Sequence, residues 1–145
     1  MEDKKMSMAV LGLGRYGKYV ARELFENGVD LMIADNDEEV INQMSDIADM
    51  AVICDLSDPE AVEKLGLGSM NVVIVAMGSS LESSIMCTTI AKEQGVHRVI
   101  VKASSERMGK ILKKLGADEI IYPKKTMAHM TVTHLISGSG SGSNN

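Results

Sequence analysis

No block of lysine and arginine residues occurs in this sequence, and its 20 acidic residues outnumber its 15 basic ones. With a formal net charge of −5 and a pI near 5.2, the chain lacks the positive charge that holds a nucleic-acid duplex through its phosphates. Long hydrophobic runs are also missing, because no apolar stretch approaches the roughly 18 residues that a membrane-spanning helix needs. We therefore expect neither nucleic acid as a partner nor direct insertion into a membrane.

Cysteine is scarce, and the two that occur, Cys54 and Cys87, lie in apolar segments and form no CxxC pair. We interpret both as small buried residues of a protein in a reducing compartment, rather than as metal ligands or a disulfide. The N-terminal segment MEDKKMSMAV has charges of both signs and no apolar core followed by a cleavage site, so it is unlike a secretory signal. These absences predict a cytoplasmic protein.

What the sequence does contain is a regular series of short apolar runs separated by amphipathic segments. The runs are almost continuously apolar, which is typical of parallel strands covered by helices on both faces. We predict strands at 8–11, 31–34, 51–54, 72–76, 99–101 and 120–122, and helices at 16–27, 38–46, 59–65, 81–94, 106–115 and 126–136. This alternation predicts an α/β fold: a Rossmann-like, doubly wound, parallel six-stranded sheet with a C-terminal crossover helix.

Local signals agree with these elements. Gly28 and Gly95 follow two predicted helix ends, where a left-handed residue is favoured. Asp58 stands before Pro59, a combination typical of a helix start. We predict one domain over residues 1–136, because a chain of 145 residues leaves little room for a second. Residues 137–145, SGSGSGSNN, are typical of a flexible Gly/Ser-rich tail, either an artificial linker or the boundary with a further domain.

A glycine-rich turn follows the first predicted strand, in the order Gly12-Leu13-Gly14-Arg15-Tyr16-Gly17. In this G-x-G-x-x-G arrangement the first glycine permits a tight turn, the second lets the backbone approach a pyrophosphate, and the third lets helix and strand pack closely. The start of the following helix adds free N–H groups and a partial positive charge. The motif alone is weak evidence, but its place between a strand and a helix predicts a phosphate-binding site.

An acidic residue stands where such a site requires one. Asp35 ends the second predicted strand, about 18 residues beyond Gly17, and a carboxylate there can accept hydrogen bonds from both ribose hydroxyls while repelling a 2′-phosphate. Asn36 and Asp37 follow without an arginine, which disfavours NADP. The alternative is that Asp35 and Asp37 only cap the next helix, and this alternative is stronger for Asp37.

Polar groups after other strands are candidates for the same site, because ligands of open parallel sheets bind at the carboxyl ends of the strands. They are Asp55 and Leu56 after the third strand, Met77-Gly78-Ser79 after the fourth and Lys102 after the fifth. Each has a structural alternative: Asp55 as a turn residue, Ser79 or Ser80 as a helix cap, and Lys102 as a solvated side chain.

Arg15 and Lys102 place positive charge where phosphates are expected. An arginine in the glycine turn can pair with a phosphate through two hydrogen bonds, and Lys102 could add a second cation across the crevice. A di- or triphosphate gains from both charges, whereas a plain nicotinamide dinucleotide needs neither. The sequence has no Ser/Tyr-x-x-x-Lys arrangement, and its histidines, His97, His129 and His134, have no placed acid partner, so we expect no catalysis.

With these residues in place, the sequence resembles the RCK/KTN (TrkA-N type) nucleotide-binding domains of bacterial Trk/Ktr potassium uptake regulatory subunits. The resemblance covers about residues 6–136. It rests on AVLGLGRYGKYVARELFENG, on the aspartate that ends the second strand, and on VICDLSDPEAVEKLGL, VIVAMGSSLESSIMCTTIAKE and KKLGADEIIYP. Such domains bind ATP, ADP or NAD(H) as effectors and assemble as dimers into octameric rings that gate a membrane potassium channel or transporter.

The resemblance implies a non-enzymatic cytoplasmic regulatory subunit, held at the inner face of the cell membrane through its transporter partner. An adenine nucleotide, ATP/ADP or NAD/NADH, would control gating through the shape of a homodimer within the ring. Residue by residue, the resemblance assigns a phosphate contact to Arg15, a ribose contact to Asp35, and further contacts to Asn36, Asp55, Leu56, Met77, Gly78, Ser79, Lys102 and Ser104. Together with the turn Gly12, Leu13, Gly14, Arg15, Tyr16 and Gly17, these residues form the predicted site.

The sequence departs from the family at one position. Relatives often have a glutamate after the proline of the ADEIIYP block, which helps to hold a cation between subunits, whereas this chain has Lys124. A protonated lysine cannot ligate a cation, so we predict no metal site. The small C-terminal ligand-binding domain of the family is also absent from this sequence. Two other functions stay open: the cofactor domain of an NAD-dependent oxidoreductase, and an NAD(H) redox sensor unrelated to potassium.

The last predicted helix, 126–136, has no strand after it, yet it contains Met127, Met130, Val132, Leu135 and Ile136. An apolar surface of this kind needs a partner, and methionines suit an interface that repacks. We therefore predict that this helix crosses to a second subunit.

Overall fold

The computed structural model describes residues 5–78 and 80–142, and within this range six strands form one parallel sheet in the order β3-β2-β1-β4-β5-β6. This is the strand order of a Rossmann sheet. The strands are β1 (Ser7–Leu11), β2 (Asp30–Asp35), β3 (Met50–Ile53), β4 (Val72–Val75), β5 (Arg98–Lys102) and β6 (Glu119–Ile121). Each predicted strand is confirmed to within one residue at either end.

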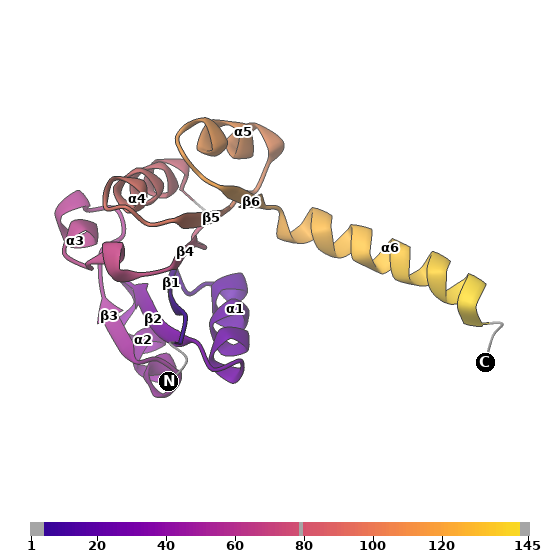
Figure 1. Cartoon of the computed structure of the whole chain (residues 1–145), viewed down its shortest axis with the longest axis horizontal. Helices are drawn as coiled ribbons and strands as arrows, with labels where there is room; N and C mark the ends of the chain where they lie inside the picture. Colours follow the sequence, from indigo (N-terminus) through magenta and orange to yellow (C-terminus); the bar gives the residue numbers. More distant parts are fainter. Residues whose placement is uncertain (1–4, 79, 143–145) are drawn as a thin grey trace.

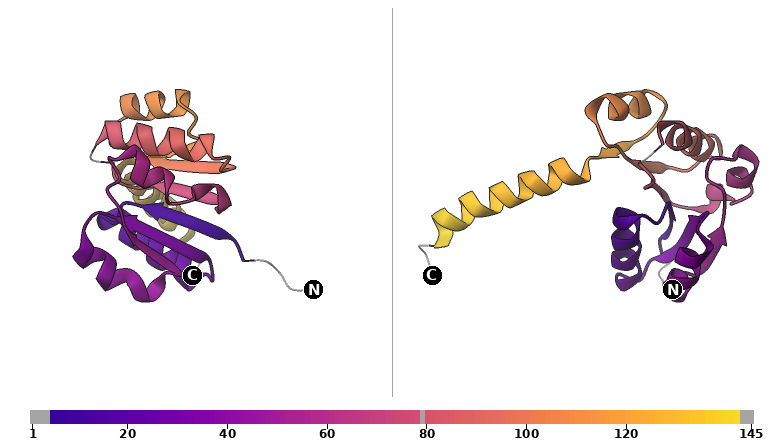
Figure 2. Two further views of the ribbon diagram at one scale, coloured as in Figure 1. Left: turned by 90° about the vertical axis from the view of Figure 1, so that its left-hand side faces the viewer. Right: turned by 180° about the vertical axis from the view of Figure 1, so that it is seen from behind.

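Helices cover both faces of the sheet (Figure 1). On one face lie α1 (Arg15–Glu26) and α2 (Glu38–Met44); on the other lie α3 (Pro59–Glu63), α4 (Leu81–Glu93) and α5 (Glu106–Lys114). The views in Figure 2 keep these two groups on opposite sides of the sheet. The short 3-10 turns η1 (Ser45–Ile47) and η2 (Leu67–Ser69) were not predicted, because three-residue turns leave no periodic pattern.

The central strands are apolar on both sides because successive side chains point to opposite faces of a sheet. In β1, Ala9 and Leu11 pack into the core beneath α3, α4 and α5, whereas Val10 packs into the core beneath α1 and α2. The edge strand β3 differs: Met50 is 52% and Ile53 is 54% exposed. The helices therefore cover this edge of the sheet less completely than its centre, since an edge strand has a neighbour on one side only.

Helix boundaries follow the local signals in the sequence. Asp58 caps α3 by accepting a hydrogen bond from the backbone N–H of Glu60 at 3.1 Å, with Pro59 in the first turn. Gly28 and Gly95 have φ values of +79° and +89°, so both occupy the left-handed conformation predicted after a helix end.

A recurring pair of hydrogen bonds fixes the strand register at the amino-terminal edge of the sheet. The residue just before β3, β4 and β6 is Asp49, Asn71 and Asp118, respectively. The backbone N–H of each of these three residues donates to the carbonyl of a residue in the adjacent strand. The backbone N–H of that strand residue donates in turn to the side chain of Asp49, Asn71 or Asp118. The strand partners are Leu31 for Asp49, Ser7 for Asn71 and Val99 for Asp118, at 2.7–2.8 Å.

Asp118 has the most elaborate surroundings of the three. Burial by itself would raise the pKa of its carboxyl group. Hydrogen bonds from the Val99 amide and from Lys92 Nζ at 3.0 Å, with the charges of Lys92 and Lys113, outweigh burial and lower the pKa below its usual value. The carboxylate form of Asp118 is therefore the form that the fold stabilises.

The final helix, α6 (Pro123–Gly142), projects away from the rest of the molecule (Figure 1). It begins before the predicted start at 126 and continues through most of the segment 137–145 that we expected to be a flexible tail. Extending an existing helix is far easier than starting one, so the Gly/Ser-rich residues follow the helix that precedes them. Within the described residues, no helix is long and apolar enough to span a membrane.

We expect the Asp118→Asn variant to lose less stability in acid than the wild type. A carboxyl group whose pKa is lowered by folding contributes stability above its unfolded pKa of about 3.9, and this contribution disappears as the pH falls through the folded pKa. Asparagine can still accept the bond from Val99, as Asn71 does from Ser7. Urea unfolding at about pH 5 and about pH 2.5 measures the difference. An acid-induced loss equal to that of the wild type would contradict this role, and the exposed Asp46→Asn serves as a control.

Candidate functional site

The turn after β1 depends on close backbone contacts. Gly12 has a φ of +97°, and a Cβ atom there would lie 2.8 Å from Met77 Cγ. A Cβ atom on Gly17 would overlap the carbonyl oxygen of Gly12, so α1 can approach β1 only if residue 17 is glycine. Gly14, in contrast, has no atom within 4 Å of its Cβ position and borders open space. The roles predicted for the three glycines agree with this geometry.

The start of α1 differs from the starts of α2, α3, α4 and α5. Those four helices have N-cap side chains that accept backbone hydrogen bonds, from Asp37, Asp58, Ser80 and Ser105, and each has an acidic residue in its first turn. The N-cap of α1 is Gly14, which makes no side-chain bond, and the first helical residue is Arg15. A cation opposes the helix dipole at this end. The start of α1 thus combines uncapped N–H groups with positive charge, a combination suited to an anion.

Asp35 holds the turn in place from the end of β2. Its Oδ2 accepts a hydrogen bond from the Leu13 N–H at 2.7 Å, and its Oδ1 accepts one from the Asp37 N–H at 2.8 Å. Asp37 caps α2 by accepting bonds from the N–H groups of Glu39 and Val40. The helix-capping alternative is therefore correct for Asp37, whereas Asp35 joins the glycine turn to the end of β2.

One cavity of about 320 Å³ lies beside this turn, and we call it the acidic cavity. Among its described lining residues, Asp35 and Asp55 are acidic and none is a lysine or an arginine. Asp55 accepts hydrogen bonds from the Ser57 hydroxyl at 2.6 Å and the Ser57 amide at 3.0 Å, and these bonds lower its pKa. Asp55 is thus a turn residue, as the structural alternative to a binding role predicts, and it also lines the cavity. The lining residues are Gly12, Gly14, Asp35, Asn36, Asp55, Leu56, Ser57, Met77, Ser80 and Ser83.

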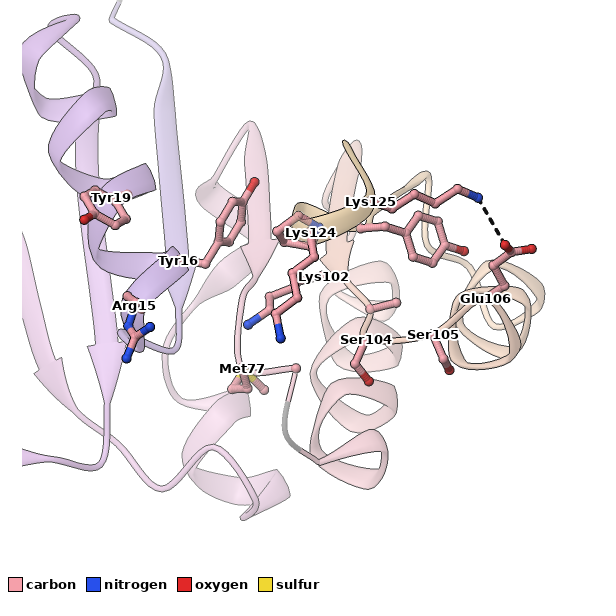
Figure 3. Close-up of a pocket in the computed structure, with 14 residues that line it drawn as sticks. Arg15, Tyr16, Tyr19, Met77, Lys102, Ser104, Ser105, Glu106, Lys124 and Lys125 are labelled. Atoms are coloured by element: carbon pink, nitrogen blue, oxygen red, sulfur yellow. Dashed lines mark hydrogen bonds and ion pairs between the residues drawn. The ribbon is translucent and has the colours of Figure 1, made fainter. Parts of the chain in front are cut away.

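A second cavity, of about 720 Å³, adjoins the first at Met77, which lines both. We call it the basic cavity, and Figure 3 shows the residues that line it. Its one acid among the described lining residues, Glu106, is bonded to Lys125 at 3.1 Å, and this bond lowers the pKa of Glu106. The lining residues are Arg15, Tyr16, Tyr19, Met77, Gly78, Lys102, Ala103, Ser104, Ser105, Glu106, Tyr122, Pro123, Lys124 and Lys125. Four of them are cationic, so the two adjoining cavities have opposite charge.

Lys102 is positioned by its neighbours at the end of β5. Its Nζ lies 6.0 Å from the ring centroid of Tyr16, within reach of a cation–π contact. Gly78 has a φ of +69°, and a Cβ atom there would lie 2.9 Å from Lys102 Cε. Glycine at position 78 therefore leaves room for the Lys102 side chain. Burial raises the pKa of Tyr16, so this phenol stays neutral at physiological pH.

The structure gathers most of the predicted site residues around the two cavities. Leu13 and Gly17 are buried beneath the turn and line neither cavity. Ser79 lies outside the described residues, while Ser80 caps α4. Gly12, Gly14, Asp35, Asn36, Asp55, Leu56 and Met77 line the acidic cavity, and Arg15, Tyr16, Met77, Gly78, Lys102 and Ser104 line the basic one.

Sequence reasoning missed the wall of the basic cavity formed by Tyr122, Lys124 and Lys125. These residues follow β6, and the rule about carboxyl strand ends that identified Lys102 applies equally to them. Tyr19 and Glu106 were also missed, and no motif distinguishes them.

Cysteine and histidine take no part in the site. Cys54 and Cys87 are buried and free, and burial raises the pKa of Cys87 to about 12, which confirms their interpretation as small buried residues. The three histidines are exposed and line neither cavity. Among the residues that the structure describes, no group of histidine, cysteine and acidic side chains could hold a metal ion.

The strand order, the glycine turn and the acid that ends β2 together define a Rossmann-like nucleotide-binding fold. The family model of the TrkA-N domain matches residues 8–123, and the chain belongs to this family.

The curated relatives of the chain include components of Ktr potassium uptake systems. The chain is 41% identical over 135 residues to Ktr system potassium uptake protein C of Bacillus subtilis, covering 93% of this chain and 61% of that protein. It is 35% identical over 127 residues to Ktr system potassium uptake protein A of Vibrio alginolyticus, covering 88% of this chain and 58% of that protein. The chain thus spans about three-fifths of the length of these relatives.

Solved structures share the fold at low sequence identity. The TrkA-N domain of the inner membrane protein ybaL from Escherichia coli has a TM-score of 0.77 at 12% identity, with 92% of this chain and 99% of that chain covered. The GsuK channel bound to NAD has a TM-score of 0.66 at 12% identity, with 85% of this chain and 22% of that chain covered.

We expect Gly17→Ala to lower the free energy of unfolding by about 2–3 kcal/mol, because the new methyl group would overlap the backbone carbonyl of Gly12. Gly14→Ala is the matched control. Its added methyl group meets open space, so the loss should stay below about 1 kcal/mol. Urea unfolding followed by circular dichroism measures both variants. Equal losses would show that the approach of α1 to β1 does not depend on residue 17.

Proposed function

We propose that this chain is the nucleotide-binding part of a non-enzymatic regulatory subunit of a potassium channel or transporter. Its effector is an adenine nucleotide, either the pair ATP/ADP or the pair NAD/NADH. The observation on which this rests is the meeting of the acidic and basic cavities at Met77. An adenine nucleotide matches this pair of cavities, because it has an uncharged, hydroxyl-rich nucleoside at one end and negatively charged phosphates at the other.

The residues present suit such a ligand. Each carboxylate oxygen of Asp35 accepts one backbone bond and has a further lone pair for a ribose hydroxyl. The open space at Gly14 leaves room for a phosphate against the N–H groups that begin α1. Beyond it, Arg15 and Lys102 extend positive charge into the basic cavity. The nucleoside would occupy the acidic cavity and the phosphates the start of α1 and the basic cavity.

The named relatives support the link to potassium. Two are components of Ktr potassium uptake systems, and GsuK is a channel whose structures include complexes with NAD and with ADP. From these relatives and the family resemblance, we infer that the chain acts at the cytoplasmic face of the cell membrane, bound to a membrane potassium channel or transporter subunit. It would assemble as a homodimer within an octameric ring.

Regulation requires two ligand states that differ in their contacts. A ligand that binds two conformations equally well does not change the populations of those conformations. ATP and ADP differ by one charged phosphate, which lies toward the basic cavity in the proposed orientation. Tyr122, Pro123, Lys124 and Lys125 of that cavity immediately precede or begin α6. In this orientation the phosphate that distinguishes ATP from ADP would lie next to α6, the helix that extends from the domain.

The surface of α6 indicates a partner on more than one side. Met127 and Met130 are 68% and 64% exposed, and Ile136 is 68% exposed. At 100° per residue, the two methionines lie on one side of the helix and Val132 and Ile136 on the other. Exposed apolar side chains that lie on two sides of a helix are typical of an interaction surface. We propose that a second copy of the chain encloses it.

Calorimetric titration of ATP, ADP, NAD and NADH into the wild type and Asp35→Ala tests the nucleotide site. We expect binding to the wild type, and a loss of roughly 1.5–3 kcal/mol in the variant, the scale of a hydrogen bond to a charged group. Because Asp35 also holds Leu13 and Asp37, unfolding of the variant must be measured in parallel. Unchanged affinity in a folded variant would show that the ribose is held elsewhere, and no binding to the wild type would overturn the proposed function.

Deleting residues 126–145 should convert a dimer into a monomer that still binds nucleotide, because both cavities are lined by residues before 126. Deleting only 139–145 is the matched control and should leave the dimer intact, since the exposed apolar residues of α6 all precede 139. Light scattering of the three chains measures their mass. An intact chain that is monomeric at tens of micromolar would refute the role of α6 in assembly.

A further inference from the structure

Three of the four cationic side chains that line the basic cavity come from three separate elements. Arg15 comes from the start of α1, Lys102 from the end of β5 and Lys124 from the first turn of α6. Figure 3 shows them around one open space, with Lys125 turned aside toward Glu106. Within the described part of the chain, none of the three forms an ion pair with an acidic residue. The cavity therefore presents uncompensated positive charge.

The donors around this cavity do not fit a divalent cation. Hard cations such as Mg²⁺ bind to carboxylates and phosphate oxygens, usually through one or two protein carboxylates. Glu106 is the one acid in the described lining, and it is already bonded to Lys125. Lys124 lines the same cavity, and its ammonium group cannot ligate a metal ion. The described lining of this cavity therefore does not suit a divalent cation held by the protein alone.

We propose that the basic cavity is a polyphosphate site that needs no divalent cation, in which Lys124 supplies, with Arg15 and Lys102, the positive charge that Mg²⁺ supplies elsewhere. The proposal rests on the proposed nucleotide site. It adds that the bound nucleotide is the metal-free anion rather than its Mg²⁺ complex. Lys124 is the specificity-determining residue, because it extends the basic wall to the start of α6.

The proposal has a direct physical consequence. Mg²⁺ neutralises two of the negative charges of ATP and occupies the same β- and γ-phosphate oxygens that the lysines and arginine would contact. The protein and Mg²⁺ therefore compete for the polyphosphate. A site that uses carboxylates and a bridging metal has the opposite behaviour, because Mg²⁺ is then required for tight binding.

The first experiment is calorimetric titration of ATP, ADP and inorganic tripolyphosphate into the full chain, once with EDTA and once with excess Mg²⁺. We expect ATP to bind about threefold to tenfold more tightly with EDTA, since two ligand charges are restored at a partly exposed cationic site. Tripolyphosphate should show the same preference. Tighter binding of ATP with Mg²⁺ than with EDTA would overturn the proposal.

The second experiment changes residue 124. Lys124→Glu should weaken metal-free ATP by about tenfold or more and should reverse the effect of Mg²⁺, because the variant replaces the cation with a metal-binding carboxylate. Lys124→Gln should weaken metal-free ATP by about threefold to fivefold without making binding depend on Mg²⁺. Lys114→Glu is the matched control: it makes the same charge change at an exposed residue of α5 outside both cavities, and should alter neither property.

The outcomes separate this inference from the function on which it rests. If ATP binds only with Mg²⁺, or if Lys124→Glu behaves like Lys114→Glu, the metal-free site is wrong while the nucleotide site stands. If no adenine nucleotide binds in either buffer, the proposed function is wrong, and tripolyphosphate decides the inference by itself. Failure of tripolyphosphate to bind in that case would overturn the inference too.

Discussion

The backbone carbonyl of Gly12 and the α-carbon of Gly17 lie so close together that no side chain fits between them, and the carboxyl edge of the sheet depends on this contact. It brings the first turn of α1 against the end of β1. The first turn of α1 thus lies next to the boundary between β1 and β4, where the strand order reverses and Rossmann folds bind ligands. Asp35 secures the same turn from the neighbouring strand, so backbone geometry fixes the position of the proposed anion site.

Most of the acidic and basic residues around the two cavities lie at opposite halves of the sheet. Asp35 and Asp55 follow β2 and β3 on one side of β1, whereas Lys102 and Lys124 follow β5 and β6 on the other side of β4. A polar ligand with one anionic end has only one favourable orientation across this gradient. The side chain of Met77, at the end of β4, marks the point where the acidic and basic halves meet.

Continuous apolar runs and glycine positions were sufficient to predict the sheet and its helices, because buried parallel strands and left-handed turns restrict residue choice strongly. The exposure of Met50 at the β3 edge could not be predicted from its run, since apolar residues on an edge strand look the same in sequence as buried ones. The place of Lys124 in the wall of the basic cavity was missed although it follows β6, because the rule about carboxyl strand ends was not applied to the last strand. The second role of Asp35, as a clamp on Leu13, depends on bonds that no motif specifies.

One consequence of α6 concerns mechanical leverage. Its first turn forms part of the wall of the basic cavity, and the helix then extends away from the domain as a single rod (Figure 1). At 1.5 Å per residue, the 20 residues of α6 span about 30 Å. A rotation of about 5° at its base would move the far end by about 2.6 Å over that length. A displacement too small to disturb the sheet is thus amplified into one large enough to change how two protein surfaces fit together.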